Sequence, residues 1–166
     1  VALGRVALVT GATAGLGYDI VKRLARDGYR VVATATSQSN CEQIHANAKQ
    51  DELSDVQAIY LNVTSEDSVR EVIGTIDSTY GRLDVLVNNA GVALRVNGKK
   101  SLVVDTPLED WQRTLDINLT GTFLVSKHAG SVERVTLERS FHVATQDVEK
   151  GTVHAKALEF AKRVTA

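Results

Sequence analysis

Short, continuously apolar runs alternate with longer, more polar segments in the first half of the chain. The runs are rich in β-branched residues and occupy residues 5–10, 30–34, 56–61 and 84–87. A continuous apolar run of this length is typical of a strand that is covered on both faces, as in a parallel sheet. The pattern therefore predicts four strands, and the one at residues 5–10 is expected to be buried and central in the sheet.

The segments that follow these runs carry apolar residues at every third or fourth position, which is the period of an amphipathic helix. We expect one helix that ends at Asp27-Gly28, one over about residues 40–52, one from an N-cap at Thr64 to Gly81, and one that starts at Pro107 and breaks near Gly121. Glycine, proline and threonine at these positions are common signals of helix ends.

Strands that alternate with helices of this length indicate an α/β fold. We expect a Rossmann-like, doubly wound parallel sheet in a three-layer α/β/α arrangement with right-handed crossovers. After Gly130 the pattern weakens, and a fifth strand at 132–137 and a last helix are expected there. No linker or internal repeat interrupts the sequence, so residues 1–166 are expected to form a single domain.

Composition and charge exclude several classes of function. The 166 residues are 43% hydrophobic and 23% charged, with a formal net charge of -1, which is typical of a globular protein and argues against a nucleic-acid partner. No apolar run reaches the roughly eighteen residues of a membrane span, so no membrane partner is expected. Cys41 is the single cysteine, which favours a reducing compartment and hence the cytoplasm. The cysteine and the four histidines show no metal-ligand spacing, so no metal is expected.

The first candidate site is the glycine cluster Gly11, Gly15 and Gly17, which follows the first strand and opens the first helix. Residues without a side chain let the main chain approach a pyrophosphate, and the N–H groups at the start of the helix face its negative charge. Between a buried strand and an amphipathic helix, the cluster predicts a dinucleotide site rather than a plain tight turn.

A second cluster, NNAG at residues 88–91, follows the fourth strand at the edge where open α/β sheets receive ligands. Together with TGxxxGxG at 10–17 and NLTGTF at 118–123, it resembles the motif set of the short-chain dehydrogenase/reductase family. The resemblance is clear over residues 3–128 and faint over 131–166.

The resemblance implies which residues hold a nicotinamide dinucleotide. In the family, the glycine turn faces the pyrophosphate and ribose, an acidic-then-apolar pair holds the adenine, and the Asn-Ala-Gly loop lies against the nicotinamide ribose. The matching positions are Gly11, Thr13, Gly15, Leu16 and Gly17 in the turn, Asn62 and Val63 in the pair, and Asn89, Ala90 and Gly91 in the loop. Asn62 stands where the family usually has Asp, and its amide can still pair with adenine.

The end of the second strand distinguishes NAD from NADP, because an acidic group there would bind the ribose 2′-OH and a basic group the 2′-phosphate. The chain has ATS at residues 35–37, no Asp or Glu over 28–41 and no Lys or Arg over 31–48. The missing carboxylate argues against a dedicated NAD site, and the hydroxyl of Thr36 can meet a phosphate. NADP is therefore favoured over NAD as the cofactor.

The family's chemistry is hydride transfer between the nicotinamide and a carbonyl or alcohol carbon. It uses a Tyr acid, a Lys four residues later and a Ser that holds the substrate oxygen. The nearest match is TVHAK at 152–156, which puts Thr152 at the tyrosine position, Lys156 at the lysine position and Ser140 at the serine position. Asn118 matches the helix Asn of the family's proton relay. All four tyrosines precede Asn118, and Thr152 cannot act as the acid because its hydroxyl titrates far above any working pH.

Two functions therefore stay open at this point. The resemblance implies an NAD(P)-dependent oxidoreductase that acts on a small carbonyl or alcohol. The alternative is a non-catalytic dinucleotide-binding protein, a sensor or interaction module, that lacks the catalytic Tyr. The chain is shorter than the family norm and lacks the family's later strands, so we expect a fragment of a dehydrogenase. A parallel sheet without its last strands exposes an apolar edge, which predicts a homo-oligomer.

Overall fold

The computed structural model describes residues 4–93, 95–96, 99–100 and 102–130. The contacts within the chain delimit one compact unit at Val1–Gly130, and a second unit, Ser131–Ala166, comprises residues outside the described ones. The single-domain organisation, the fifth strand and the last helix expected from the sequence therefore stay predictions.

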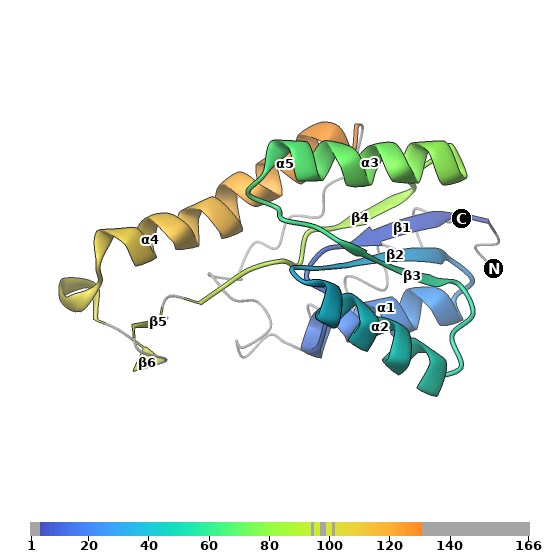
Figure 1. Ribbon diagram of the computed structural model, residues 1–166, viewed down its shortest axis with the longest axis horizontal. Helices are drawn as coiled ribbons and strands as arrows, with labels where there is room; N and C mark the ends of the chain where they lie inside the picture. The colour runs from blue at the N-terminus through green and yellow to red at the C-terminus, as the bar shows by residue number, and fades with distance from the viewer. Residues whose placement is uncertain (1–3, 94, 97–98, 101, 131–166) are drawn as a thin grey trace. The chain divides into compact units, whose positions relative to one another are not determined.

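Four parallel strands form the central sheet, in the order β3-β2-β1-β4 (Figure 1). They are β1 (Val6–Val9), β2 (Arg30–Ala35), β3 (Val56–Tyr60) and β4 (Val85–Val87). In the register of the sheet, Leu8 of β1 lies opposite both Val32 of β2 and Leu86 of β4. All of β1 and most of β2 is buried, which explains why their sequences are continuously apolar. The predicted parallel sheet is confirmed.

Helices cover both faces of the sheet. The helices α1 (Gly15–Arg26) and α2 (Gln38–Gln50) lie on one face, and α3 (Glu66–Tyr80) and α5 (Gly121–His128) lie on the other (Figure 1). The buried core between the strands and the second pair of helices contains Val6, Leu8, Val32, Leu61, Val63, Val69, Val72, Ile76, Leu124 and Val125. The three-layer, Rossmann-like arrangement expected from the sequence is thus confirmed.

The last described helical segment does not break where the sequence suggested. The helix α4 (Leu108–Leu115) continues through a π-helical turn at Asp116–Thr120 directly into α5. The predicted break near Gly121 is therefore wrong, because this glycine has helical dihedral angles. A Cβ atom there would lie 2.7 Å from Cγ2 of Val63. The missing side chain lets the helix pack closely against the segment after β3.

The N-cap of α3 is Ser65 and not Thr64. The Ser65 hydroxyl accepts a hydrogen bond from the main-chain N–H of Ser68 at 3.3 Å, whereas the Thr64 hydroxyl donates to Oδ1 of Asn62 at 2.8 Å. The predicted cap was therefore displaced by one residue, because Thr64 belongs to the turn that Asn62 organises. Such local side-chain bonds compete with helix capping among Ser, Thr and Asn.

Charged side chains join the start of α3 to the end of α5. The Glu66 carboxylate accepts a hydrogen bond from Nζ of Lys127 at 2.8 Å and lies 2.8 Å from Nε2 of His128. The bonds from Lys127 and His128 lower the pKa of Glu66 to about 2. The cluster therefore links two helices of one layer through a carboxylate that stays ionised in mild acid.

Between β4 and α4 the described residues include a short antiparallel pair and a 3₁₀ turn. The pair is β5 (Arg95–Val96) with β6 (Lys99–Lys100), and the turn occupies Val103–Asp105. No described helix is long and apolar enough to cross a membrane.

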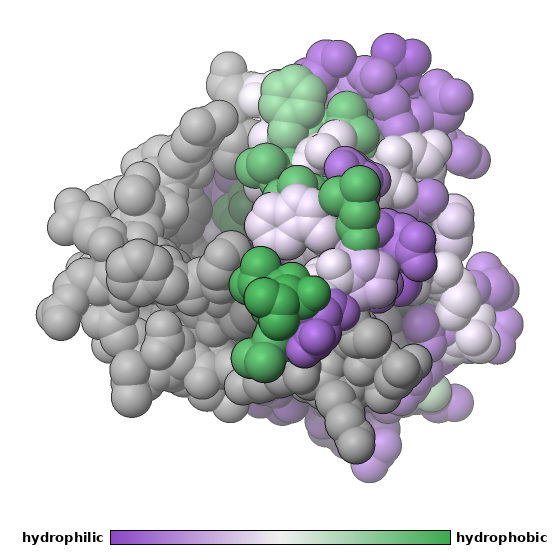
Figure 2. Space-filling model, turned by 90° about the vertical axis from the view of Figure 1, so that its left-hand side faces the viewer, coloured by the Kyte–Doolittle hydropathy of each residue, from purple (hydrophilic) through white to green (hydrophobic). Residues whose placement is uncertain are grey.

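Large apolar side chains are exposed along α4 and its continuation. Leu108, Trp111, Leu119 and Phe123 are exposed by 78%, 47%, 66% and 60%, and we call these four residues the apolar stripe. Figure 2 faces the end of the molecule where α4 lies in Figure 1, and it shows hydrophobic side chains gathered on this surface. Large exposed apolar patches commonly mark interaction sites.

Candidate functional site

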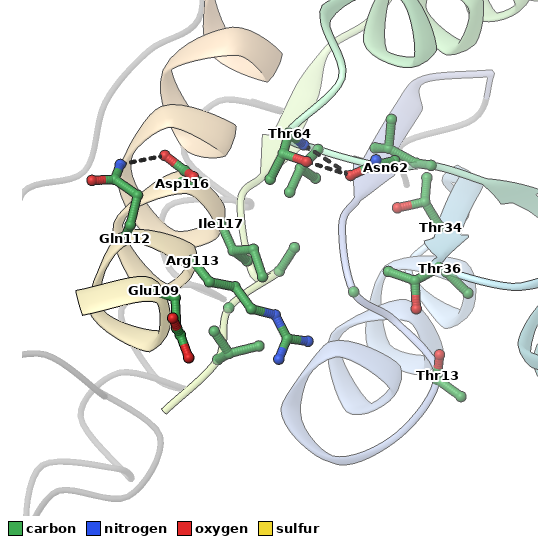
Figure 3. A pocket seen from close by; sticks show the side chains of 17 residues that line it. Thr13, Thr34, Thr36, Asn62, Thr64, Glu109, Gln112, Arg113, Asp116 and Ile117 are labelled. Atoms are coloured by element: carbon green, nitrogen blue, oxygen red, sulfur yellow. Dashed lines mark hydrogen bonds between the residues drawn. The ribbon is translucent and has the colours of Figure 1, made fainter. Parts of the chain in front are cut away.

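A cavity of about 760 Å³ lies at the carboxyl ends of the four parallel strands, and α4 closes its other side (Figure 3). The strand side of its wall consists of Gly11, Thr13, Thr34, Ala35, Thr36, Leu61, Asn62, Val63, Thr64, Ala90, Gly91 and Val92. The helix side consists of Glu109, Gln112, Arg113, Asp116 and Ile117. This is the edge at which doubly wound sheets bind ligands, and the volume suits a cofactor.

The structure gathers most of the cofactor-binding residues expected from the sequence around this cavity. The predicted residues that line it are Gly11, Thr13, Thr36, Asn62, Val63, Ala90 and Gly91. The remaining predicted residues do not line the cavity: Gly15, Leu16 and Gly17 belong to the first turn of α1, and Asn89 belongs to the loop after β4. Among the residues that the structure describes, no cluster of His, Cys, Asp and Glu could hold a metal ion.

The three glycines of the first turn have different roles. Gly11 has a φ of 64°, and a Cβ on it would lie 2.8 Å from Cα of Ala90, so glycine is required there. A Cβ on Gly17 would lie 2.5 Å from both the Gly11 carbonyl oxygen and Nδ2 of Asn89. Gly15 also has a positive φ, of 59°, but nothing lies within 4 Å of its missing Cβ. Gly11 and Gly17 thus allow the turn to pack against the loop after β4, and Gly15 leaves the outer surface of the turn open.

The start of α1 lacks the side-chain cap that the next two helices have. Ala14 precedes α1 and offers no side-chain hydrogen bond, whereas Ser37 and Ser65 each cap the helix that follows. The first N–H groups of a helix carry partial positive charge and need acceptors. An anion next to this turn would supply them.

Thr10 and Asn89 lock the glycine turn to the loop after β4. The Thr10 hydroxyl oxygen accepts hydrogen bonds from the main-chain N–H groups of Asn89 and Ala90, at 3.0 and 2.9 Å. In return, Nδ2 of Asn89 donates to the carbonyl oxygens of Thr10 and Gly11, at 3.0 and 2.9 Å. We call this set of four bonds the Thr10–Asn89 lock. Because the amide of Asn89 is used in the lock, the parts of this loop that face the cavity are Ala90 and Gly91.

The orientation of the Asn62 amide is fixed by its neighbour. Its Oδ1 accepts hydrogen bonds from the main-chain N–H of Thr64 at 3.1 Å and from the Thr64 hydroxyl at 2.8 Å. A main-chain N–H can only donate, so the oxygen must face Thr64. The Nδ2 group is then left as a donor in the cavity wall. It suits a ring nitrogen of a purine, which accepts, rather than an exocyclic amino group.

Asn118 holds the other side of the same loop. It lies in the π-helical turn, its Oδ1 accepts from the main-chain N–H of Val92 and its Nδ2 donates to the Val92 carbonyl oxygen, both at 2.8 Å. Its own carbonyl oxygen accepts from the hydroxyl of Thr122 at 2.9 Å. Its side chain thus clamps the loop that carries Gly91 and Val92 into the wall. Single π-helical turns occur often at functional sites.

Sequence reasoning missed the helix side of the wall. Glu109, Gln112, Arg113, Asp116 and Ile117 come from α4 and the π-helical turn, far along the chain from the strand ends. Only Ile117, next to Asn118, had a neighbouring motif that could have indicated it. The predicted catalytic residues Ser140, Thr152 and Lys156 lie outside the described residues, and their roles stay predictions.

Comparison with known proteins identifies the family of the chain. The family model that describes the short chain dehydrogenases matches residues 5–133. The chain therefore belongs to the short-chain dehydrogenase family, as its motifs predicted.

The relatives that match this chain carry the names of enzymes with different substrates. The chain is 38% identical over 125 residues to the 3-oxoacyl-acyl-carrier-protein reductase FabG of Vibrio cholerae, covering 75% of this chain and 47% of that protein. It is 36% identical over 129 residues to the mitochondrial borneol dehydrogenase of Lavandula x intermedia, covering 78% and 46%. The chain thus spans about half the length of the curated relatives it matches.

A solved structure of an actinorhodin polyketide ketoreductase with NADPH has the same fold. It superposes with a TM-score of 0.69 at 30% identity, covering 75% of this chain and 46% of that one.

Proposed function

We propose that this chain is the cofactor-binding part of an NAD(P)-dependent short-chain oxidoreductase that transfers hydride between the nicotinamide and a small carbonyl or alcohol. The observation that carries the proposal is the cavity at the strand ends, bordered by an uncapped glycine turn and by the locked loop after β4. When bound, the nicotinamide supplies the hydride chemistry. The residues of this chain bind and orient it.

The donors and surfaces around the cavity fit the parts of a dinucleotide. The N–H groups at the start of α1 would hold the diphosphate, because Gly15 leaves the turn open there. Asn62 would donate to the adenine, with Val63 and Ile117 as apolar walls. The main chain at Ala90 and Gly91 would face the nicotinamide ribose.

The end of β2 supports NADP over NAD. Thr34, Ala35 and Thr36 form this part of the cavity wall, and no carboxylate is present among them. A carboxylate there would bind the two hydroxyls of the NAD ribose and repel the 2′-phosphate of NADP. Hydroxyl groups can bind a phosphate instead.

The catalytic step is proposed from sequence alone. Ser140 would hold the substrate oxygen, Lys156 would bind beside the cofactor, and Asn118 would order this end of the site. Thr152 occupies the position of the family's acid without its chemistry. We therefore expect the chain to bind the cofactor with little or no turnover unless another acid takes part.

Calorimetric titration of the purified chain with NADPH and with NADH tests the binding half of the proposal. Micromolar binding is expected, and a chain that binds neither NADPH nor NADH would refute the proposed cofactor site. A panel of small carbonyl compounds, followed by oxidation of NADPH, tests the catalytic half. A gain in rate for Thr152→Tyr would identify the missing acid. Binding without turnover in both the native chain and this variant would favour a cofactor sensor.

We also propose that the protein is a homo-oligomer. The apolar stripe on α4 and its continuation supports this proposal, because its four large apolar side chains are exposed to water in the single chain. Burying them against a second copy would remove their apolar surface from water. The cytoplasmic location expected from the sequence stays a prediction.

A further inference from the structure

The proposed NADP site lacks a positive charge on its strand side. No lysine or arginine occurs over residues 31–48, and the wall at the end of β2 offers only the hydroxyls of Thr34 and Thr36 as side-chain donors. A phosphate monoester carries close to two negative charges at neutral pH, and hydroxyls alone hold it weakly. A second source of charge is therefore needed if NADP is preferred.

The helix side of the cavity contains one cation, Arg113. It projects from α4 into the space that Thr13 and Thr36 line from the opposite wall (Figure 3). Its guanidinium has no hydrogen-bond or ion-pair partner in the part of the chain that the structure describes. A planar guanidinium presents paired donors that match phosphate oxygens.

Two carboxylates also line the helix side, and neither engages Arg113. Oδ1 of Asp116 accepts a hydrogen bond from Nε2 of Gln112 at 2.9 Å. The side chain of Glu109 extends in another direction from that of Arg113 (Figure 3). The guanidinium is therefore available to an anionic ligand, and it offsets part of the negative charge that these carboxylates bring to the cavity.

We propose that Arg113 binds the 2′-phosphate of NADP from the α4 side of the cavity, opposite the Thr36 hydroxyl, and thereby selects NADP over NAD. This inference rests on the proposed dinucleotide function. The diphosphate is the competing anion, but the glycine turn and the uncapped start of α1 already provide donors for it. The 2′-phosphate is the one anionic group of the cofactor for which the strand side provides no charge.

The test compares the affinities of NADP and NAD for the native chain and for Arg113→Gln, by calorimetry at low ionic strength. Loss of one charged hydrogen bond predicts that NADP binds about tenfold more weakly to the variant. The affinity for NAD should stay unchanged. Arg113→Lys should give an intermediate result, because an ammonium keeps the charge and loses the planar fork.

The matched control is Arg26→Gln, which removes the same charge from an exposed position in the last turn of α1, away from the cavity. It should leave both affinities as they are. Added salt should also weaken NADP binding to the native chain more than to Arg113→Gln, because salt screens the ion pair between Arg113 and the phosphate, which the variant lacks. Equal urea midpoints for the native chain and the three variants would show that folding is unaffected.

The outcomes separate this inference from the proposed function. An equal fall in NADP and NAD affinity would place Arg113 at the diphosphate and overturn the inference while leaving dinucleotide binding intact. Unchanged NADP affinity in Arg113→Gln would overturn it as well. If the native chain bound neither nucleotide, both proposals would fail. The pair 2′,5′-ADP and 5′-ADP serves as a second probe, since the two ligands differ only in the phosphate assigned to Arg113.

Discussion

Replacing Thr10 by valine tests the lock between the glycine turn and the loop after β4. The two side chains have nearly the same shape, so the change removes the hydroxyl without opening a cavity. The main-chain N–H groups of Asn89 and Ala90 then lose their acceptor. Asn89 keeps a second bond, to the Val87 carbonyl oxygen at 3.1 Å, whereas no other hydrogen bond of the Ala90 N–H is found among the described residues.

The expected magnitude follows from these bonds. Each of these two hydrogen bonds contributes about 0.5–1.5 kcal/mol net, so losing both lowers the free energy of unfolding by about 1–3 kcal/mol. The bond that the Thr10 hydroxyl donates to the Val87 carbonyl oxygen is lost as well, but at 3.4 Å it contributes little. For a chain of this length, each kcal/mol lowers the Tm by about 2–4 °C. Thr10 is 1% exposed, so water cannot reach its position to replace the lost acceptor. Nucleotide binding should weaken too, because Ala90 lies in the cavity wall.

Urea unfolding followed by circular dichroism measures the loss, and Thr34→Val is the matched control. Thr34 is also 1% exposed and lies in the neighbouring strand β2, but its hydroxyl makes no hydrogen bond with another described residue. Its replacement should change the free energy of unfolding by about 0.5 kcal/mol or less. If the two variants were equally stable, the lock would contribute nothing and the reasoning would be refuted.

Three further predictions use other contacts. Gly17→Ala should abolish nucleotide binding, measured by calorimetry, because its Cβ would lie 2.5 Å from Nδ2 of Asn89. The control Gly74→Ala, on the open surface of α3, should raise the free energy of unfolding by about 0.5–1 kcal/mol, measured by urea unfolding. The pKa of Glu66 is lowered to about 2 from 4.5, so its stabilisation is complete above pH 4.5 and lost as the pH falls toward 2. In Glu66→Gln, the free energy of unfolding should therefore depend less steeply on pH between pH 4.5 and 2. A pH dependence as steep as that of the native chain would contradict this. Phe123→Lys should yield a smaller species by light scattering; an unchanged mass would argue against the apolar stripe as an interface.

Several features of the candidate site were predictable because they depend on residues close together in the chain. A buried strand, a glycine turn and an amphipathic helix follow one another within residues 5–26, and their order alone indicates where a diphosphate would bind. The Asn-Ala-Gly loop was likewise recognisable from its position directly after the fourth strand.

Two other expectations from local patterns were wrong. Thr64 looked like an N-cap, but its hydroxyl bonds to Asn62, and Ser65 caps the helix instead. Gly121 looked like a helix break, but it lies within a continuous helix, and its missing side chain leaves room for Val63. In each case a contact that periodicity does not encode decided the outcome.

By itself, the sequence determined the parallel α/β class, the family and the strand-side residues of the site, since these follow from hydrophobic period and short motifs. The tertiary structure alone decided that α4 closes the cavity, that Arg113 faces Thr36 across it, and that Thr10 accepts from a loop 79 residues away. Such pairs meet only because the sheet places the ends of β1, β2 and β4 at one edge. Local patterns in the sequence do not specify which distant segments share that edge. The packing of the whole compact unit decides it.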